Sequence, residues 1–170
     1  NLPNDRRQHC RRRDATVICR IDPTSESAEK EQFIEDPDVL QHNLQPTFAI
    51  TTGHPKIVKI AQEAQVSSGN KMEQAQALMD WIATNIEQRP VDVFTALDVL
   101  ASGQSECQGH ALLFAAMART IGLPTRVVNG IVYSPVLKGF VYHSWNECYL
   151  DGSWMAVDPT LKQLPAGATH

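Results

Sequence analysis

The hydrophobic residues of this chain change their spacing part-way along it. Between residues 55 and 121 they recur three and four positions apart, which is the period of helices with a buried face. Beyond residue 125 they alternate with polar residues or gather in β-branched and aromatic runs, which is typical of strands. We therefore expect helices over 55–66, 71–88, 93–101 and 107–121, and strands over 125–134, 140–150 and 153–158. This order predicts an α+β fold in which the last helix packs on an antiparallel sheet.

The helix predicted over 107–121 is apolar on nearly every side, which places it in the middle of the domain. Ser105 is the expected N-cap, so Cys107 would lie in the first turn. Unpaired backbone N–H groups and the positive end of the helix dipole stabilise a thiolate there, although Glu106 acts in the opposite sense. A lone cysteine is more often a small buried hydrophobe, but this position favours a nucleophile. His110, one turn further on, is expected to be a structural histidine.

The Asp151-Gly152 pair is a strong signal for a two-residue hairpin turn. If Leu150 faces Ser153 across it, the same register sets His143 opposite Thr160. Asp158 then becomes a diagonal neighbour of His143 on the same sheet face, within side-chain reach. Cys148 points to the other face and is expected in the core. Taken alone, Asp158 before Pro159 is equally well explained as a residue that ends a strand in a turn.

Cys107, His143 and Asp158 are the three groups that thiol acyl transfer requires. The imidazole activates the thiol, and the carboxylate fixes the tautomer of the ring and stabilises the imidazolium. Such chemistry needs no metal and no organic cofactor. An alternative is a metal site made by Cys107, His110 and His143, although the cysteines lack the Cys-x-x-Cys spacing of zinc modules.

Three segments of the chain resemble the transglutaminase-like superfamily: GQSECQGHALLFAAMARTIGLPTRV, YHSWNECYLDGSWMAVDPT and the closing GATH. The resemblance covers residues 103–170 and extends loosely back to about Pro55. It implies a papain-like core in which Cys107 is the nucleophile, His143 the general base and Asp158 the orienting acid. Many members carry glycine where this chain has Ser105. The family contains transglutaminases, cysteine peptidases, deamidases, peptide N-glycanases and inactive members, so the fold alone does not select a substrate.

Three further residues are candidates for contacts with the substrate. Trp145 shares the face of His143 by parity, where it either lines the cleft or fills the seam between helix and sheet. Gln104 and Gln108 flank the cysteine closely enough in sequence to be tested as donors to an oxyanion. Trp81 lies on a different predicted helix and is expected at the edge of the core rather than in the site.

The chain has 170 residues and an ordinary hydrophobic content of 42%. We expect residues 1–50 to wrap the core irregularly and residues 51–170 to form the catalytic core. A formal net charge of −4 argues against nucleic-acid binding, although the first twenty residues are basic and the following stretch is acidic. The sequence has no membrane span and no signal-peptide run, and its abrupt ends suggest part of a longer protein.

Cys10 and Cys19 could form a disulfide if this part of the protein lies outside the cytoplasm, and the alternation of Val17, Cys19 and Ile21 predicts a strand there. Because bacterial chains that resemble this one look like envelope or secreted proteins, we favour a periplasmic or other extracytoplasmic location.

The sequence therefore predicts a thiol enzyme that transfers or hydrolyses the acyl group of a peptide or side-chain amide in a protein or peptide substrate. Hydrolysis is favoured over cross-linking because water is always available. The alternative is a catalytically inactive domain of the same fold that uses its cleft to bind a peptide.

Overall fold

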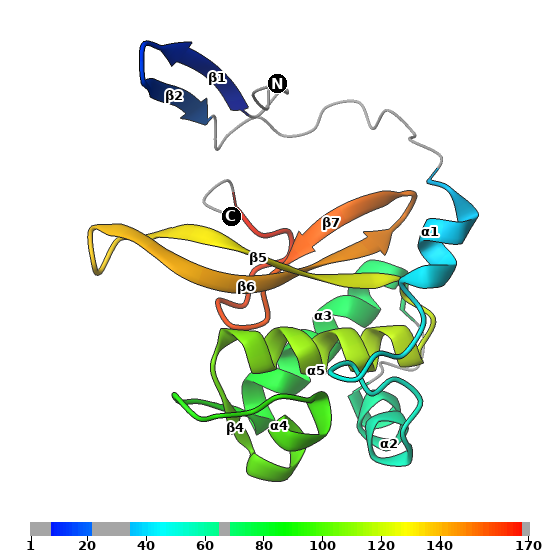
Figure 1. The fold of residues 1–170 in the computed structure, drawn as a ribbon. Helices are drawn as coiled ribbons and strands as arrows, with labels where there is room; N and C mark the ends of the chain where they lie inside the picture. The colour runs from blue at the N-terminus through cyan, green and yellow to red at the C-terminus, as the bar shows by residue number, and fades with distance from the viewer. Residues whose placement is uncertain (1–7, 22–34, 65–68, 168–170) are drawn as a thin grey trace.

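The computed structural model describes residues 8–21, 35–64 and 69–167, and it confirms the α+β class. A layer of helices, α2 to α5, packs on one face of a three-stranded antiparallel sheet with the order β5–β6–β7 (Figure 1). Helix α5, Cys107–Thr120, lies between the sheet and the other helices. It joins the two layers because it has apolar residues on every side.

Local capping signals decide where the other helices begin and end. Helix α2 covers Pro55–Ala64, α3 covers Lys71–Asn85 and α4 covers Ala96–Ser102. Helix α4 begins later than expected because Thr95 and Asp98 form a capping box. The Thr95 side chain accepts the backbone N–H of Asp98, and the Asp98 side chain accepts the backbone N–H of Thr95. The helix ends at Ser102, and the C-cap Gly103 has a left-handed φ of 68°. The predicted end of the first helix, at 65–66, lies outside the described residues.

Residues 86–88, expected to continue α3, are extended instead. Strand β3, Glu87–Gln88, pairs in parallel with β4, Gln104–Ser105, immediately before α5. This pairing links the end of α3 to the loop that leads into α5. It depends on a contact between segments far apart in sequence, so the helical period could not predict it.

Ser105 is not the N-cap of α5, contrary to expectation. Glu106 holds that position without a side-chain cap, and Cys107 is the first helical residue. The Ser105 hydroxyl is buried and bonded to His110 Nδ1 at 2.9 Å, and the same nitrogen lies 2.9 Å from the Glu106 carbonyl oxygen. His110 is 3% exposed, so it is a structural histidine as predicted.

The sheet has the predicted register as far as Val157. Strands β5 (Thr125–Ser134), β6 (Gly139–Leu150) and β7 (Ser153–Val157) are joined in order, and Leu150 pairs with Ser153 across Asp151 and Gly152, which both have positive φ. The expected pair of His143 with Thr160 does not form, because β7 ends at Val157. Asp158 instead makes an isolated bridge with Gln163. Cys148 is fully buried in the core, as expected.

Two described segments precede the helical layer. Strands β1 (Gln8–Arg13) and β2 (Thr16–Ile21) form a hairpin in which Cys10 and Cys19 are paired residues joined by a disulfide. Helix α1, Pro37–His42, was not predicted, although Asp36 caps it and Pro37 starts it. The part of the expected irregular segment that falls on residues 22–34 lies outside the described residues, as do the closing residues 168–170. Among the described residues, no helix combines the length and the apolar character needed to cross a bilayer.

A substitution at Gly109 tests how closely α5 must pack against β4. A Cβ at this position would lie 2.5 Å from Ser105 Cβ and 2.9 Å from Val93 Cγ2. We expect Gly109→Ala to lower the free energy of unfolding by about 1–3 kcal/mol through overpacking, measured by urea denaturation. Gly139→Ala is the matched control, because its Cβ would meet only the Leu137 carbonyl oxygen at 3.8 Å. Equal stabilities of the two variants would contradict the close approach.

Candidate active site

The Cys107 thiol lies partly exposed at the first residue of α5, facing β6. Its hydrogen bond with the His143 ring lowers the pKa of the Cys107 thiol, and burial acts in the opposite sense. The backbone N–H groups of Ser144 and Gln108 are also directed at the sulfur and lower the pKa further, as does the charge of His143. The thiolate is therefore stabilised by a cation, by a strand N–H and by a first-turn helix N–H.

His143 is held between Cys107 and Asp158. Its Nε2 lies 2.6 Å from Asp158 Oδ2, which leaves Nδ1 as the nitrogen available to the thiol. The hydrogen bond to Asp158 is the main cause that raises the pKa of His143 to about 9, and the bond with Cys107 adds to it against the effect of burial. The imidazolium is thus the favoured form at neutral pH.

Asp158 is positioned by a tight turn rather than by the continuing strand. Its Oδ1 accepts backbone N–H bonds from Thr160 at 2.8 Å and Leu161 at 2.9 Å, and its own backbone exchanges two hydrogen bonds with Gln163. The residue is fully buried. Because the turn holds one carboxylate oxygen, the other is held in a fixed position toward the ring.

Trp145 supports the ring from behind. Its indole is stacked on the His143 ring with centroids 6.3 Å apart and planes inclined by 18°, and it is 8% exposed. Gly130 gives it room, since a Cβ there would lie 2.7 Å from the indole. The prediction that Trp145 shares the face of His143 is consistent with this stacking.

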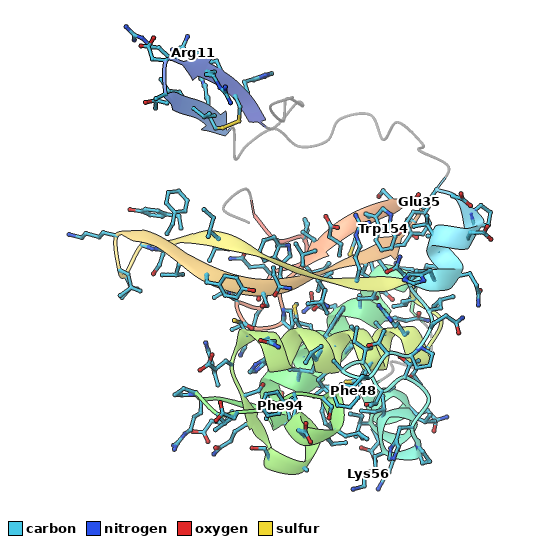
Figure 2. All side chains as sticks on the ribbon, viewed as in Figure 1. Arg11, Glu35, Phe48, Lys56, Phe94 and Trp154 are labelled. Carbon is cyan, nitrogen blue, oxygen red and sulfur yellow. A yellow bond between two sulfur atoms is a disulfide. The ribbon has the colours of Figure 1, made fainter. Side chains whose placement is uncertain are left out.

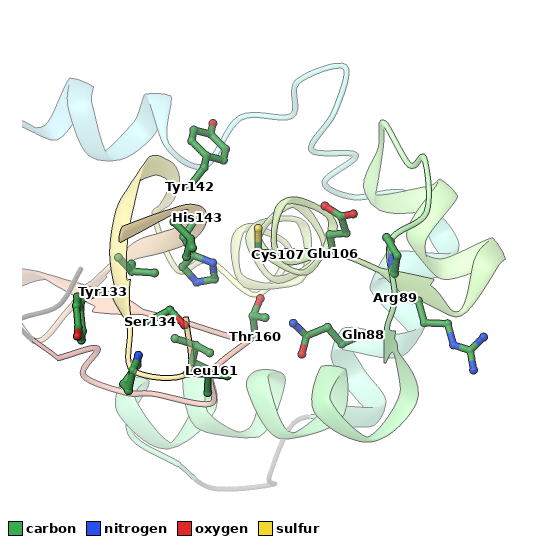
Figure 3. Close-up of a pocket in the computed structure, with 15 residues that line it drawn as sticks. Gln88, Arg89, Glu106, Cys107, Tyr133, Ser134, Tyr142, His143, Thr160 and Leu161 are labelled. Atoms are coloured by element: carbon green, nitrogen blue, oxygen red, sulfur yellow. The ribbon is translucent and has the colours of Figure 1, made fainter. Parts of the chain in front are cut away.

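A cavity of about 570 Å³ opens beside the thiol (Figure 3). The polar side of the cavity is formed by β3 and the start of α5. The opposite, apolar side is formed by the end of the β5–β6 hairpin, and the turn after Asp158 forms the rest of the wall. Its lining residues are Gln88, Arg89, Pro90, Glu106, Cys107, Val132, Tyr133, Ser134, Pro135, Val136, Val141, Tyr142, His143, Thr160 and Leu161.

Of the residues predicted to contact a substrate, Trp145, Gln104 and Gln108 are not among the described residues that line this cavity. The Gln104 amide instead donates to Glu87 Oε2 at 3.0 Å, and the Gln108 side chain is exposed. Sequence reasoning missed Gln88, whose side chain is directed into the cavity beside Thr160 (Figure 3). Pro90 was the one local sign that the preceding helix had ended.

The alternative metal site is not supported by the described residues. Cys107 and His143 lie together, but the His110 ring is turned to Ser105 and Glu106. Within residues 8–21, 35–64 and 69–167 no group of three or more His, Cys, Asp or Glu side chains is arranged to hold a metal ion.

The family model of the transglutaminase-like superfamily matches residues 58–159, which contain the cysteine, the histidine and the aspartate described above. The chain belongs to this superfamily. Residues of the chain are also 33% identical over 107 positions to kyphoscoliosis peptidase of Homo sapiens and, to the same extent, to that of Mus musculus. Each match covers 52% of this chain and 15% of the relative, so the chain spans only a small part of these curated relatives.

Two solved structures share the fold of this superfamily member. One is the provisionally assigned cysteine protease of Cytophaga hutchinsonii, with a TM-score of 0.65 and 23% identity over 79% of this chain and 47% of that one. The other is the periplasmic domain of TgpA from Pseudomonas aeruginosa, with a TM-score of 0.59 and 22% identity over 78% of this chain and 50% of that one. At these identities the likeness is one of fold, and it agrees with the two-layer arrangement around α5.

The opposite pKa shifts of the thiol and the imidazole predict how Cys107 reacts with iodoacetamide. Because the pKa of Cys107 is lowered, its alkylation should reach half of its maximal rate below pH 8.5, the ordinary value for a thiol. His143→Ala should move that midpoint upward, since it removes the largest cause. Mass spectrometry resolves each cysteine, and buried Cys148, whose pKa is raised to about 11, serves as the internal control. Equal labelling of Cys107 and Cys148 would contradict the electrostatic argument.

Proposed function

We propose that this chain is a thiol enzyme that forms a thioester on Cys107 from a peptide or side-chain amide and then hydrolyses or transfers the acyl group. The observation that carries the proposal is the 2.6 Å hydrogen bond between buried Asp158 and His143, whose other ring nitrogen is available to a thiol at a helix start. Few structural roles need a cysteine, an imidazolium and a carboxylate aligned beside an open cavity.

The protonation states support a complete cycle. The Cys107 thiolate attacks the amide carbonyl carbon, and the electron pair of the C=O bond moves onto oxygen. His143, protonated up to about pH 9, donates its proton to the leaving nitrogen as the C–N bond breaks, and ammonia or an amine departs. The neutral ring then removes a proton from water or from a second amine, which attacks the thioester and releases the acyl group from sulfur.

Asp158 acts on this cycle through His143. It keeps Nε2 protonated, so Nδ1 is the nitrogen that exchanges a proton with sulfur, substrate and water. Because its other oxygen accepts two backbone N–H bonds, the carboxylate holds the ring without rotating itself. The Trp145 indole stacked against the ring limits its movement in the remaining direction.

We favour hydrolysis over transamidation because water has free access to a partly exposed thiol. The name of the human relative, a peptidase, supports an amide substrate in a polypeptide. No nucleic acid is expected as partner at a formal net charge of −4.

Replacing the nucleophile tests the reaction directly. Cys107→Ala should abolish release of ammonia or new amines from a panel of unfolded proteins, while the free energy of unfolding changes by no more than about 1 kcal/mol. Wild-type protein quenched in acid should carry an acyl adduct on Cys107 by mass spectrometry, and Cys148→Ala, which removes the other free thiol, should still form it. Turnover by Cys107→Ala at the wild-type rate would reject the mechanism, and a reactive thiol that never acquires an adduct would favour the inactive binding domain.

Gln88 is the residue we propose as a side-chain donor to the oxyanion. It pairs with Ser105 in the parallel β3–β4 ladder, two residues before Cys107, and its side chain is directed into the cavity. A carboxamide N–H placed across from the first turn of α5 would act together with the helix N–H groups on the developing negative charge. Gln104 supports this less well because its amide is already bonded to Glu87.

Two matched substitutions distinguish the catalytic roles of these two glutamines. Gln88→Ala should lower kcat about 100-fold with little change in KM, because an oxyanion donor acts mainly in the transition state. Gln104→Ala removes an amide from the same short ladder and should change kcat by less than about threefold, since an exposed polar contact contributes little. Steady-state kinetics on the same amide substrate provide the measurement, and equal losses in the two variants would exclude Gln88 as a specific donor.

A further inference from the structure

The end of the β5–β6 hairpin projects past the helical layer (Figure 1). Its register puts two cross-strand pairs side by side on one face, Ile131 with Tyr142 and Tyr133 with Phe140. These side chains are 61%, 68%, 42% and 67% exposed, respectively, and the rings of the second pair meet edge to face at 5.6 Å. Single exposed apolar residues are common, but a contiguous group of them indicates a binding surface.

This apolar surface is continuous with the candidate active site. Of its four side chains, Tyr133 and Tyr142 line the same cavity as Cys107 and His143, and so does Val136 in the hairpin turn. Between residues 131 and 142 the sequence has a single charged residue, Lys138. Gln88, Arg89 and Glu106 make the opposite side polar, so a ligand in the cavity meets an apolar wall on one side and a polar wall on the other. The volume of about 570 Å³ is in the usual range for a cleft that binds several groups of a ligand.

The backbone of β6 supplies the second half of the surface. Strand β7 pairs only with Asn146–Leu150, so no described strand pairs with this edge of β6 at Phe140 and Tyr142. Backbone groups of alternate residues point to the same edge of a strand. Because the Ser144 N–H is directed at the thiol, the N–H and C=O of Tyr142 and Phe140 point to that same edge, in line with Cys107.

We propose that the substrate of this thiol enzyme is an extended polypeptide segment that adds as a strand to the β6 edge and places bulky apolar side chains on the hairpin. The inference rests on the proposed function and narrows it to a substrate class. An added strand would gain main-chain hydrogen bonds at Tyr142 and Phe140, which give affinity, while alternate side chains contact Tyr142 and Val136, which give selectivity. The amide that reacts is the one that lies next to Cys107 when this strand is bound.

Protection of the thiol by peptides measures this binding at the site itself. The probe is a nine-residue peptide with Phe and Ser alternating on both sides of a central Ala, and the control peptide has Thr at every Phe position. The readout is the peptide concentration that halves the rate of Cys107 alkylation by iodoacetamide, followed by mass spectrometry. We expect the Phe peptide to protect at a concentration at least about tenfold lower, as burial of one or more aromatic side chains implies. N-methylation of the amides on one edge of the Phe peptide should remove most of that advantage.

Variants assign the binding to the hairpin. Tyr142→Ser and Phe140→Ser should each raise the half-protecting concentration of the Phe peptide about fivefold or more. Phe94→Ser is the matched control, since Phe94 is also 68% exposed but belongs neither to the hairpin nor to the cavity lining, and it should leave protection unchanged. Circular dichroism melting curves confirm that each variant is folded.

The outcomes separate this inference from the proposed function. Equal protection by the two peptides, or protection that survives both hairpin substitutions, overturns the docking proposal while an activated thiol in the unprotected reaction still supports catalysis. A Cys107 that alkylates like an ordinary thiol contradicts the proposed function, and the ratio between the two peptides still reports on docking. Sedimentation that shows wild-type dimers and monomeric Tyr142→Ser protein would also overturn the proposal, because the hairpin would then be an interface between two copies of the chain.

Discussion

The packing of α5 against β6 is the constraint on which the rest of the structure depends. The helix is buried on all sides from Gly109 to Arg119, so its position is set by the sheet on one side and by α2, α3 and α4 on the other. The Asn146 side chain donates to the Ala111 carbonyl oxygen at 3.0 Å and fixes the helix along the strand. Because Cys107 is the first residue of that helix and His143 lies three residues before Asn146, one packing contact brings the thiol and the ring together.

The electrostatics of the site follow from this geometry. A thiol and an imidazole that merely met on a protein surface would shift each other's pKa weakly, because water screens their charges. Here Asp158 is fully buried, His143 is 6% exposed, and the carboxylate is held by backbone N–H groups. The charge on Asp158 is therefore stabilised by dipoles that cannot turn away, and the raised pKa of His143 follows from it. The proposed catalytic pair of thiolate and imidazolium depends on this turn as much as on the two residues themselves.

Side chains on the outer face of the sheet, away from α5, stabilise the far end of the β6–β7 hairpin (Figure 2). The Arg126 guanidinium stacks 4.3 Å above the Trp154 ring and its Nε donates to Glu147, while the Trp154 indole donates to Glu35 next to α1. These contacts tie the segment before the helical layer to β7. By contrast, the projecting end of the β5–β6 hairpin has an apolar face that none of the described elements covers. Other side chains thus pack on the sheet at the β6–β7 end, whereas the end of the β5–β6 hairpin, where we propose that the substrate binds, is exposed.

The sequence by itself determined the four helices of the helical layer, the three strands of the sheet and most of the sheet's register. The three-and-four spacing of apolar residues identified the helices, and the turn at Asp151 and Gly152 set the pairing of β6 with β7, because both signals act between near neighbours along the chain. The alternation of side chains along β6 was enough to predict that Cys148 lies in the core and that Trp145 shares the face of His143. The start of α5 at Cys107 could also be predicted, although the expected cap at Ser105 was wrong.

Tertiary structure decided what lies around the thiol. Gln88 reaches the cavity through a parallel ladder between segments that have no local signal for pairing, and Asp158 reaches His143 through a turn that ends β7 before the expected pair with Thr160 can form. The apolar surface at Tyr142 exists because the helical layer stops short of the hairpin end. Each of these features depends on contacts between residues distant in sequence, and periodicity, which records only which face of an element is buried, does not specify them.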